Sequence, residues 1–252
     1  WSGTGDVHPG NLNATPAIAQ SALLYVLRLL VEEDLPLNEG MMEHVQVHLP
    51  ENCLLSPDFS LTADQAPAVV GGNVETSQRL VAALLRALQR CAGSQATMNN
   101  VLFGNGQFGY YETVCGGTGA GPNFSGTDAV HSHMTNTRIT DPEILEFRYP
   151  VRVERFAIRR GSGGRGRFSG GDGVVRVLRF MDRVELSLLT QQRREGAYGL
   201  AGGQSGAVGR QWIERADGER VELSAIDGSS MYPGDRLVLE TPGGGGYGAQ
   251  DG

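Results

Sequence analysis

The stretch Gly161–Phe180 reads GSGGRGRFSGGDGVVRVLRF and decides how the second half of the chain folds. Its first six residues match the glycine spacing of dinucleotide-binding loops, in which a phosphate meets the N-terminus of the next helix. Here three further glycines follow, and the run Val174–Phe180 is rich in the residues typical of a strand. No helix is available to receive a phosphate. We therefore interpret the motif as a turn that leads into a strand.

The same pattern of predicted strands separated by glycines extends from residue 149 to the C-terminus. Apolar runs and alternations predict further strands at Val151–Ile158, Val184–Leu189, Gln211–Arg215 and Arg236–Glu240. The dipeptide Asp217-Gly218 is typical of a hairpin turn. The glycines Gly243–Gly246 have two interpretations: a tail that packs where only glycine fits, or a disordered end.

The first part of the chain alternates helical and extended patterns. Thr15-Pro16 is a helix start, and apolar residues at helical spacing predict a helix over residues 15–32. A second helix is predicted from near Thr76 to a stop at Gly93. Alternation predicts a strand at His44–Leu49.

Between the second helix and residue 148 the pattern is mixed. Strands are predicted at Val101–Phe103 and Tyr110–Val114, joined by a turn at Gly104–Gly106, and Asp141-Pro142 opens a short helical turn. The sequence therefore predicts an α+β fold. A mixed helix-and-strand portion, residues 1–148, precedes a β-rich, glycine-rich portion, residues 149–252.

Composition excludes several functions. The net charge is -7 and every basic side chain is arginine, which excludes a lysine Schiff base or a phosphate-loop lysine in this chain and argues against nucleic acid as a partner. No apolar run is long enough to span a membrane. Three unpaired cysteines, Cys53, Cys91 and Cys115, indicate reduced thiols in the cytoplasm. Because the chain opens at Trp1, we expect it to be an interior part of a longer polypeptide.

The stretch His131-Ser132-His133 contains two side chains that are suited to proton transfer or metal binding. In a strand, residues two apart point to the same side, so the two imidazoles would be able to bind a metal or transfer protons together. The alternative is a pair of histidines hydrogen-bonded at a seam of the fold. Glu112 precedes both and is a third candidate for acid–base chemistry.

The glycine loop Gly116–Gly121 lies between Glu112 and the histidines. At Gly117 and Gly119 a substrate or phosphate would be able to approach bare backbone amides, although a flexible turn is the alternative. Arg138 is a candidate clamp for a carboxylate or phosphate. We expect Glu112, this loop, His131, His133 and Arg138 to converge on one pocket.

The entrance of the second helix carries a further set of polar groups, with Asn73 and Thr76 in its first turns. Two functions fit them. Their position lets them bind an anion of the substrate at the helix N-terminus. They are also ordinary helix-capping residues.

Several ordered motifs resemble the hydantoinase B/5-oxoprolinase family, and the likeness runs essentially from end to end. The residues that carry the resemblance are His8–Asn13, Gly72–Arg79, Gln95–Asn100, Tyr110–Thr113 with the glycine loop, His131–Arg138, Gly161–Gly173 and Thr241–Gly248. Among members of the family, the stretch 122–150 is most similar to 5-oxoprolinases.

The resemblance implies an ATP-dependent opening of a cyclic amide. In such enzymes an A-type ATPase part phosphorylates the amide oxygen, and the B-type part, to which this chain is similar, completes hydrolysis of the activated ring. ATP would therefore bind a partner part and not this chain. A divalent metal is a second candidate cofactor, with unknown ligands. The expected partners are the N-terminal remainder of the B-type part, the A-type part and a small cyclic amide.

Two alternatives remain open from the sequence. The chain is also similar to part of a related ATP-dependent ketone carboxylase. It is equally compatible with a structural module of the complex that has no catalytic residues of its own.

Overall fold

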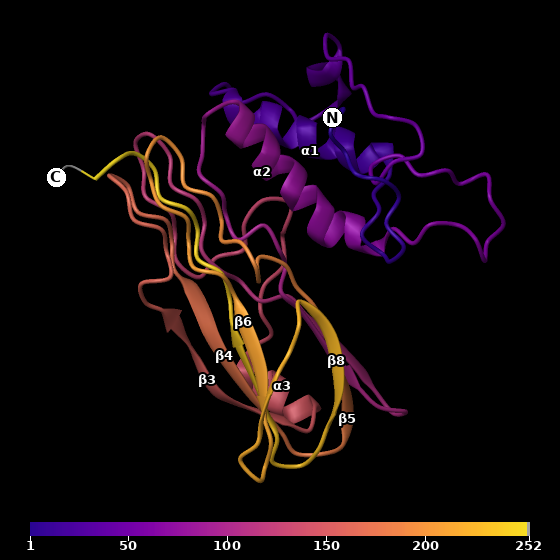
Figure 1. Cartoon of the computed structure of the whole chain (residues 1–252), viewed down its shortest axis with the longest axis vertical. Coiled ribbons are helices and arrows are strands. Elements are labelled where there is room, and N and C mark those ends of the chain that lie inside the picture. Colours follow the sequence, from indigo (N-terminus) through magenta and orange to yellow (C-terminus); the bar gives the residue numbers. More distant parts are fainter. Residues whose placement is uncertain (251–252) are drawn as a thin grey trace. The chain divides into compact units, whose positions relative to one another are not determined.

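The computed structural model of the chain describes residues 1–250. They form two compact units that divide between Leu88 and Gln89, and each is described by itself (Figure 1). Among the described residues are three α-helices and nine strands, all nine of them in the second unit. The α+β class predicted from the sequence is confirmed.

The first unit is built on two α-helices. Helix α1, Pro16–Leu30, follows Thr15 and has proline in its first turn, as predicted. It packs against α2, Ser77–Ala87, which continues from the π-helix η2, Gly72–Thr76. A short 3-10 helix η1, Glu39–Met42, lies between them in sequence.

Two predictions for this unit are wrong. The alternation of polar and apolar residues at 44–49 forms no strand among the described residues; these residues are in a turn or irregular. Alternation is not sufficient to form a strand where no other strand pairs with the segment. Helix α2 ends at Ala87, six residues before Gly93. Gln89, in a left-handed conformation (φ 55°), follows its end.

The second unit contains two antiparallel sheets. The first has the order β2-β1-β5-β8 and the second the order β3-β4-β9-β6-β7. The strands are β1 (Asn100–Gly104), β2 (Gly109–Glu112), β3 (Val151–Arg159), β4 (Gly173–Phe180), β5 (Val184–Leu189), β6 (Arg210–Glu214), β7 (Arg220–Glu222), β8 (Ile226–Met231) and β9 (Arg236–Glu240). The short helix α3, Pro142–Arg148, precedes β3.

Apolar side chains of both sheets form one core. Phe103 of β1 meets Phe180 of β4 edge to face, with ring centroids 5.5 Å apart. Val101 and Leu188 from the first sheet and Leu178 from the second belong to the same buried cluster. Burying both inner faces against each other is what holds the two sheets together.

The predicted strands of this unit are present: Val184–Leu189 and Arg236–Glu240 have the predicted ends, and the ends of the others differ by at most two residues. Strands β7 and β8 were not predicted. The sequence of β8, Ile226–Met231, is polar and contains a glycine, so it has little strand preference of its own. It forms because β5 pairs with it along its whole length.

Beyond the strands, glycine-rich extended segments run side by side (Figure 1). We call residues 116–121, 161–171, 196–206 and 243–248 the glycine array. Its middle segment is 243–248, whose six consecutive amides all donate to other segments. In two of the three pairs of amides three apart, both amides reach the same segment: 243 and 246 donate to residues 207 and 204, and 244 and 247 donate to 171 and 168. The third pair, 245 and 248, donates to residues 93 and 200 in different segments. Hydrogen bonds to several neighbouring segments with a spacing of three are what a polyproline II helix would allow, whereas a β-strand alternates between two sides.

The array packs backbone against backbone. A Cβ atom at Gly244 would lie 1.9 Å from the carbonyl oxygen of Thr118, and one at Gly243 would lie 2.0 Å from that of Ser162. The interpretation of this end as a tail that packs where only glycine fits is therefore confirmed. The motif at 161–166 belongs to the same array and precedes no helix, as expected.

The predicted boundary at residue 148, between the mixed portion and the β-rich portion of the sequence, does not coincide with the division into compact units. Strands β1 and β2 precede it in sequence, yet β1 pairs with β5 along five residue pairs. Long-range strand pairing therefore joins residues 100–112 to the β-rich part of the chain.

Candidate functional site

The segment 131–140 carries the predicted histidines and Arg138, and it is irregular rather than a strand. Before it, Val130 and Gly116 exchange two backbone hydrogen bonds, which anchor the segment to the glycine array. After it, Asp141 caps α3 by accepting from the amides of Glu143 and Ile144, at 2.9 and 3.3 Å. The strand geometry assumed for His131 and His133 is therefore wrong, because these two anchors hold a loop between them.

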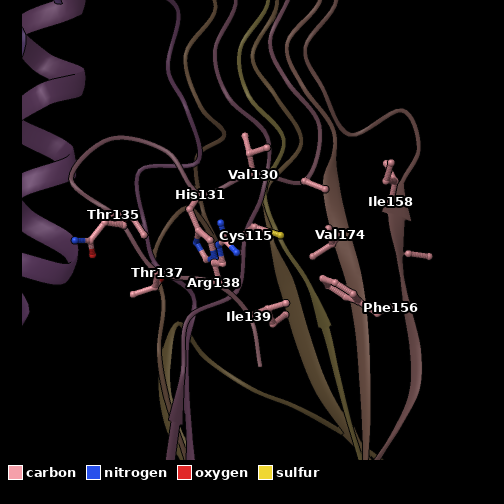
Figure 2. Close-up of a pocket in the computed structure, with 13 residues that line it drawn as sticks. Cys115, Val130, His131, Thr135, Thr137, Arg138, Ile139, Phe156, Ile158 and Val174 are labelled. Carbon is pink, nitrogen blue, oxygen red and sulfur yellow. The ribbon is translucent and has the colours of Figure 1, made fainter. Parts of the chain in front are cut away.

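This loop forms one wall of a cavity of about 770 Å³ in the second unit. Figure 2 shows the loop residues on one side and residues of β3 and β4 on the other. The polar lining residues are His131, Thr135, Asn136, Thr137 and Arg138. The remaining lining residues are Cys115, Ala129, Val130, Ile139, Phe156, Ala157, Ile158 and Val174. The cavity is thus polar on one wall and apolar on the other.

His131 and Arg138 are the two predicted site residues that this cavity brings together. Burial lowers the pKa of His131, so its imidazole is neutral at neutral pH. Within residues 1–250, no protein atom hydrogen-bonds to its buried Nδ1 atom. Arg138 is exposed at the cavity and carries a permanent positive charge. A neutral base beside a guanidinium suits a substrate with an anionic group.

His133 lies apart from this cavity and is not among its lining residues. Its Nε2 is 3.4 Å from the hydroxyl of Ser94, which also accepts a hydrogen bond from the amide of Gly119. Burial lowers the pKa of His133 to about 4. His133 therefore connects the loop to the glycine array.

Glu112 does not line the cavity either. Its carboxylate forms an ion pair with Arg176 of β4, with Oε1 2.9 Å from Nε, and accepts from Arg176 Nη2 at 3.1 Å. Tyr110 donates to the same carboxylate at 2.6 Å. Burial raises the pKa of Glu112, while Arg176 and Tyr110 favour its charged form. Its contacts, which also include a hydrogen bond from the backbone of Thr140, are all with the protein interior.

The amides of the glycine loop are already used within the fold. Every backbone N–H from 116 to 121 donates to a protein acceptor, and those of Gly117 and Gly119 reach Pro242 and Ser94. Cβ atoms at Gly117 and Gly119 would lie 1.9 Å from the carbonyl oxygens of Gly171 and Ala92. These glycines are therefore explained by close backbone packing, and the loop presents no free amide to a phosphate.

Asn73 and Thr76 belong to the first unit and lie in the π-helix η2. Neither caps α2 in the expected way: Thr76, at the N-cap position, makes no side-chain capping bond. Its hydroxyl donates instead to the carbonyl of Leu12 at 2.6 Å. The carbonyl of Asn73 accepts from the hydroxyl of Ser77. The π-helix continues directly into α2, so this helix has no separate capped start.

Some residues of the site were not predicted. Phe156, Ile158 and Val174 line its apolar wall. In the sequence they read as ordinary strand residues, and only the pairing of β3 with β4 places Phe156 opposite Arg176. Arg176 was detectable as the one charged residue inside the run Gly173–Val177.

The donors for a metal do not come together in this chain. Across residues 1–250, no three histidine, cysteine, aspartate or glutamate side chains cluster closely enough to hold an ion. The residues of the candidate site therefore do not fit a metal centre of their own. Cys53, Cys91 and Cys115 are buried and free, and burial raises the pKa of Cys91 and Cys115 to about 11. None of the helices in residues 1–250 has the length and apolar character needed to cross a membrane.

Comparison with known proteins identifies the family. Residues 1–250 match the hydantoinase B/oxoprolinase family, and the chain belongs to it. 5-oxoprolinase 1 of Arabidopsis thaliana is 46% identical over 249 residues, which are 99% of this chain and 19% of that protein. The resemblance inferred from the motifs is confirmed.

Two solved structures share the fold. The ATP-dependent caprolactamase of Pseudomonas jessenii superposes with a TM-score of 0.78 at 23% identity, over 97% of this chain and 45% of that one. A nucleotide-free acetone carboxylase superposes with a TM-score of 0.80 at 16% identity, over 98% of this chain and 39% of that one. The chain spans about a fifth of the length of the first curated relatives it matches, so it corresponds to one part of larger proteins.

Proposed function

We propose that this chain is the C-terminal part of a B-type subunit or domain that completes the opening of a cyclic amide. A separate A-type part would first phosphorylate the amide oxygen with ATP. Family membership supports this proposal, as do relatives named 5-oxoprolinase and a structural neighbour named ATP-dependent caprolactamase. The cavity that joins His131 and Arg138 to an apolar wall is the observation that carries it.

The cavity suits an activated ring in three respects. Arg138 would bind the anionic carboxylate or phosphate of the substrate. Phe156, Ile158 and Val174 would contact the ring methylenes. Neutral His131 would take a proton from the water that adds to the activated carbon and pass it to the ring nitrogen as the C–N bond breaks, which leaves an acyl phosphate. A second water would then hydrolyse the acyl phosphate to a carboxylate and inorganic phosphate.

The role of His131 is tested in the assembled enzyme with 5-oxoproline and ATP. We expect His131→Gln to lower kcat by about 10²–10⁴, because one acid–base group is lost while its volume is largely kept. His44→Gln, on the exposed surface of the first unit, is the matched control and should leave kcat unchanged. Equal kcat in both variants would refute the assignment of His131.

A ketone carboxylase is the second candidate, and the acetone carboxylase fold is the observation that favours it. Adding bicarbonate distinguishes the two: a carboxylase needs it for ATP turnover, whereas a cyclic-amide hydrolase does not. Alanine substitution of His131 tests the third alternative, a structural module without catalytic residues. The His131→Ala variant would then keep full activity per folded molecule.

The partners follow from the same proposal. They are the N-terminal remainder of the B-type part, the A-type ATPase part and a small cyclic amide, with ATP held by the A-type part. Purified alone, this chain should neither hydrolyse ATP nor open 5-oxoproline, and measurable turnover by it would contradict that division of labour. We further propose a cytoplasmic location, which the three free cysteines support because disulfides are rare there.

A further inference from the structure

The loop is tied to the strand β2 region on both sides of Arg138. Before it, the hydroxyls of Thr137 and Thr113 lie 2.7 Å apart. After it, the hydroxyls of Thr140 and Tyr110 lie 2.8 Å apart. Two tied points three residues apart restrict the backbone between them, so they determine where the Arg138 side chain begins.

Tyr110 is in turn held by the buried ion pair. Its hydroxyl lies 2.6 Å from Oε2 of Glu112, and Glu112 contacts Arg176 at 2.9 and 3.1 Å. The side chains of Arg176 and Glu112 are 1% and 2% exposed. Separating two charges in such a setting is strongly unfavourable, so the pair is a rigid support for Tyr110.

The direction of these hydrogen bonds follows from the number of protons. A tyrosine hydroxyl has one proton, and burial raises the pKa of Tyr110, so the group stays protonated. Because a carboxylate only accepts, this proton goes to Glu112. Thr140 then donates its own proton to the oxygen of Tyr110. The three hydrogen bonds that link Arg176, Glu112, Tyr110 and Thr140 therefore each have a defined donor and acceptor.

The same ion pair contacts the opposite wall of the cavity. Arg176 and Phe156 are direct partners in the register of β4 with β3. The Arg176 guanidinium carbon lies 5.1 Å from the centroid of the Phe156 ring, which lines the cavity. The buried ion pair thus contacts the apolar wall directly, and it supports the polar wall through Tyr110 and through the hydrogen bond between Glu112 and the Thr140 backbone.

We propose that Tyr110 is a positioning residue, which the buried Glu112–Arg176 pair holds in place so that Thr140 sets Arg138 for binding the anionic group of the substrate. The inference rests on the proposed function, since it takes Arg138 to be the substrate clamp. It gives Glu112 a role that acts through Tyr110 and through its hydrogen bond with the Thr140 backbone, and not through proton transfer.

Tyr110→Phe and Thr140→Val each remove this contact and keep the shape of the side chain. In the assembled enzyme we expect either change to raise KM for 5-oxoproline by about fivefold to tenfold with kcat nearly unchanged, as for one lost hydrogen bond. Tyr149→Phe is the matched control, because Tyr149 packs against the Tyr110 ring at 4.8 Å within the same aromatic cluster. It should leave KM unchanged. Glu112 and Arg176 are poorer targets, since either change leaves a buried charge unpaired.

A double-mutant cycle separates positioning from a general structural effect. Arg138→Ala should raise KM about tenfold to a hundredfold. Adding Tyr110→Phe to Arg138→Ala should raise KM no further, because the clamp that Tyr110 positions is gone. A further rise would overturn the proposal. A normal KM in Tyr110→Phe alone would also overturn it while leaving the proposed function intact, whereas a normal KM in Arg138→Ala would refute Arg138 as the clamp itself.

Discussion

The two sheets and the glycine array of the second unit are packed in opposite ways. In the sheets, large side chains such as Phe103 and Phe180 fill the space between two layers. In the array, extended segments touch through their backbones, and a methyl group has no room at Gly117 or Gly244. Residues that stabilise the first region do so by what they bury. Glycines stabilise the second by what they lack, because they let hydrogen-bonded segments approach more closely than side chains would allow.

The largest effect is expected from adding one methyl group to the array. In Gly244→Ala the new Cβ atom would lie 1.9 Å from the Thr118 carbonyl oxygen and 2.3 Å from its carbon. Both are backbone atoms held by other segments, so neither can rotate away. We expect the chain to be insoluble or to lose its cooperative unfolding transition, measured by soluble yield and urea denaturation.

The control for this prediction is Gly106→Ala. Gly106 lies in the turn between β1 and β2, and a Cβ atom there would meet nothing within 4 Å. Its free energy of unfolding should stay within about 0.5 kcal/mol of the original. If both alanine variants unfold at the same urea concentration, the array is not packed as described.

A smaller effect is expected from removing a side chain in the sheets. Phe103→Ala leaves a cavity beside Phe180 and Tyr110, whose ring centroids lie 5.5 and 4.8 Å from that of Phe103. We expect a loss of about 3–5 kcal/mol in the free energy of unfolding, measured by urea denaturation. Phe147→Ala, at a side chain that is 88% exposed, should change it by no more than about 0.5 kcal/mol. Equal losses in the two variants would contradict the core assignment.

The smallest effect concerns pH at His133, which joins the cavity loop to the array through Ser94. Its pKa is about 4 in the folded chain and near 6.5 when unfolded. Between these values the unfolded state binds more protons, so stability is complete above pH 6.5 and falls as the pH drops toward 4. In this pH range, the contribution of His133 to the free energy of unfolding should change by up to about 1.4 kcal/mol per pH unit.

The measurement is the free energy of unfolding between pH 7 and 4. His133→Gln should flatten this slope, whereas His44→Gln, on the exposed surface of the first unit, should not. An unchanged slope in His133→Gln would show that His133 is not buried in its neutral form.

Much of the fold was predictable because local pattern and tertiary structure agree. Helix α1, the hairpin of β1 and β2, and the cap of α3 by Asp141 follow from residue preferences that act over a few positions. Two predictions failed for the same reason: a strand was predicted at 44–49 where there is none, and strand β8 was not predicted. A strand exists only where another strand pairs with it, and the partner is not visible in the local sequence.

The candidate site divides in the same way. The motifs were sufficient to predict the family and the α+β class, which are confirmed, and to name His131 and Arg138, which line the cavity. The folded chain was needed to show that Glu112 pairs with Arg176, 64 positions away, and that the glycine loop packs against other backbones. This difference arises because the charge and shape of a side chain follow from its residue type alone. Its burial and its partners depend on segments that come together only when the chain folds.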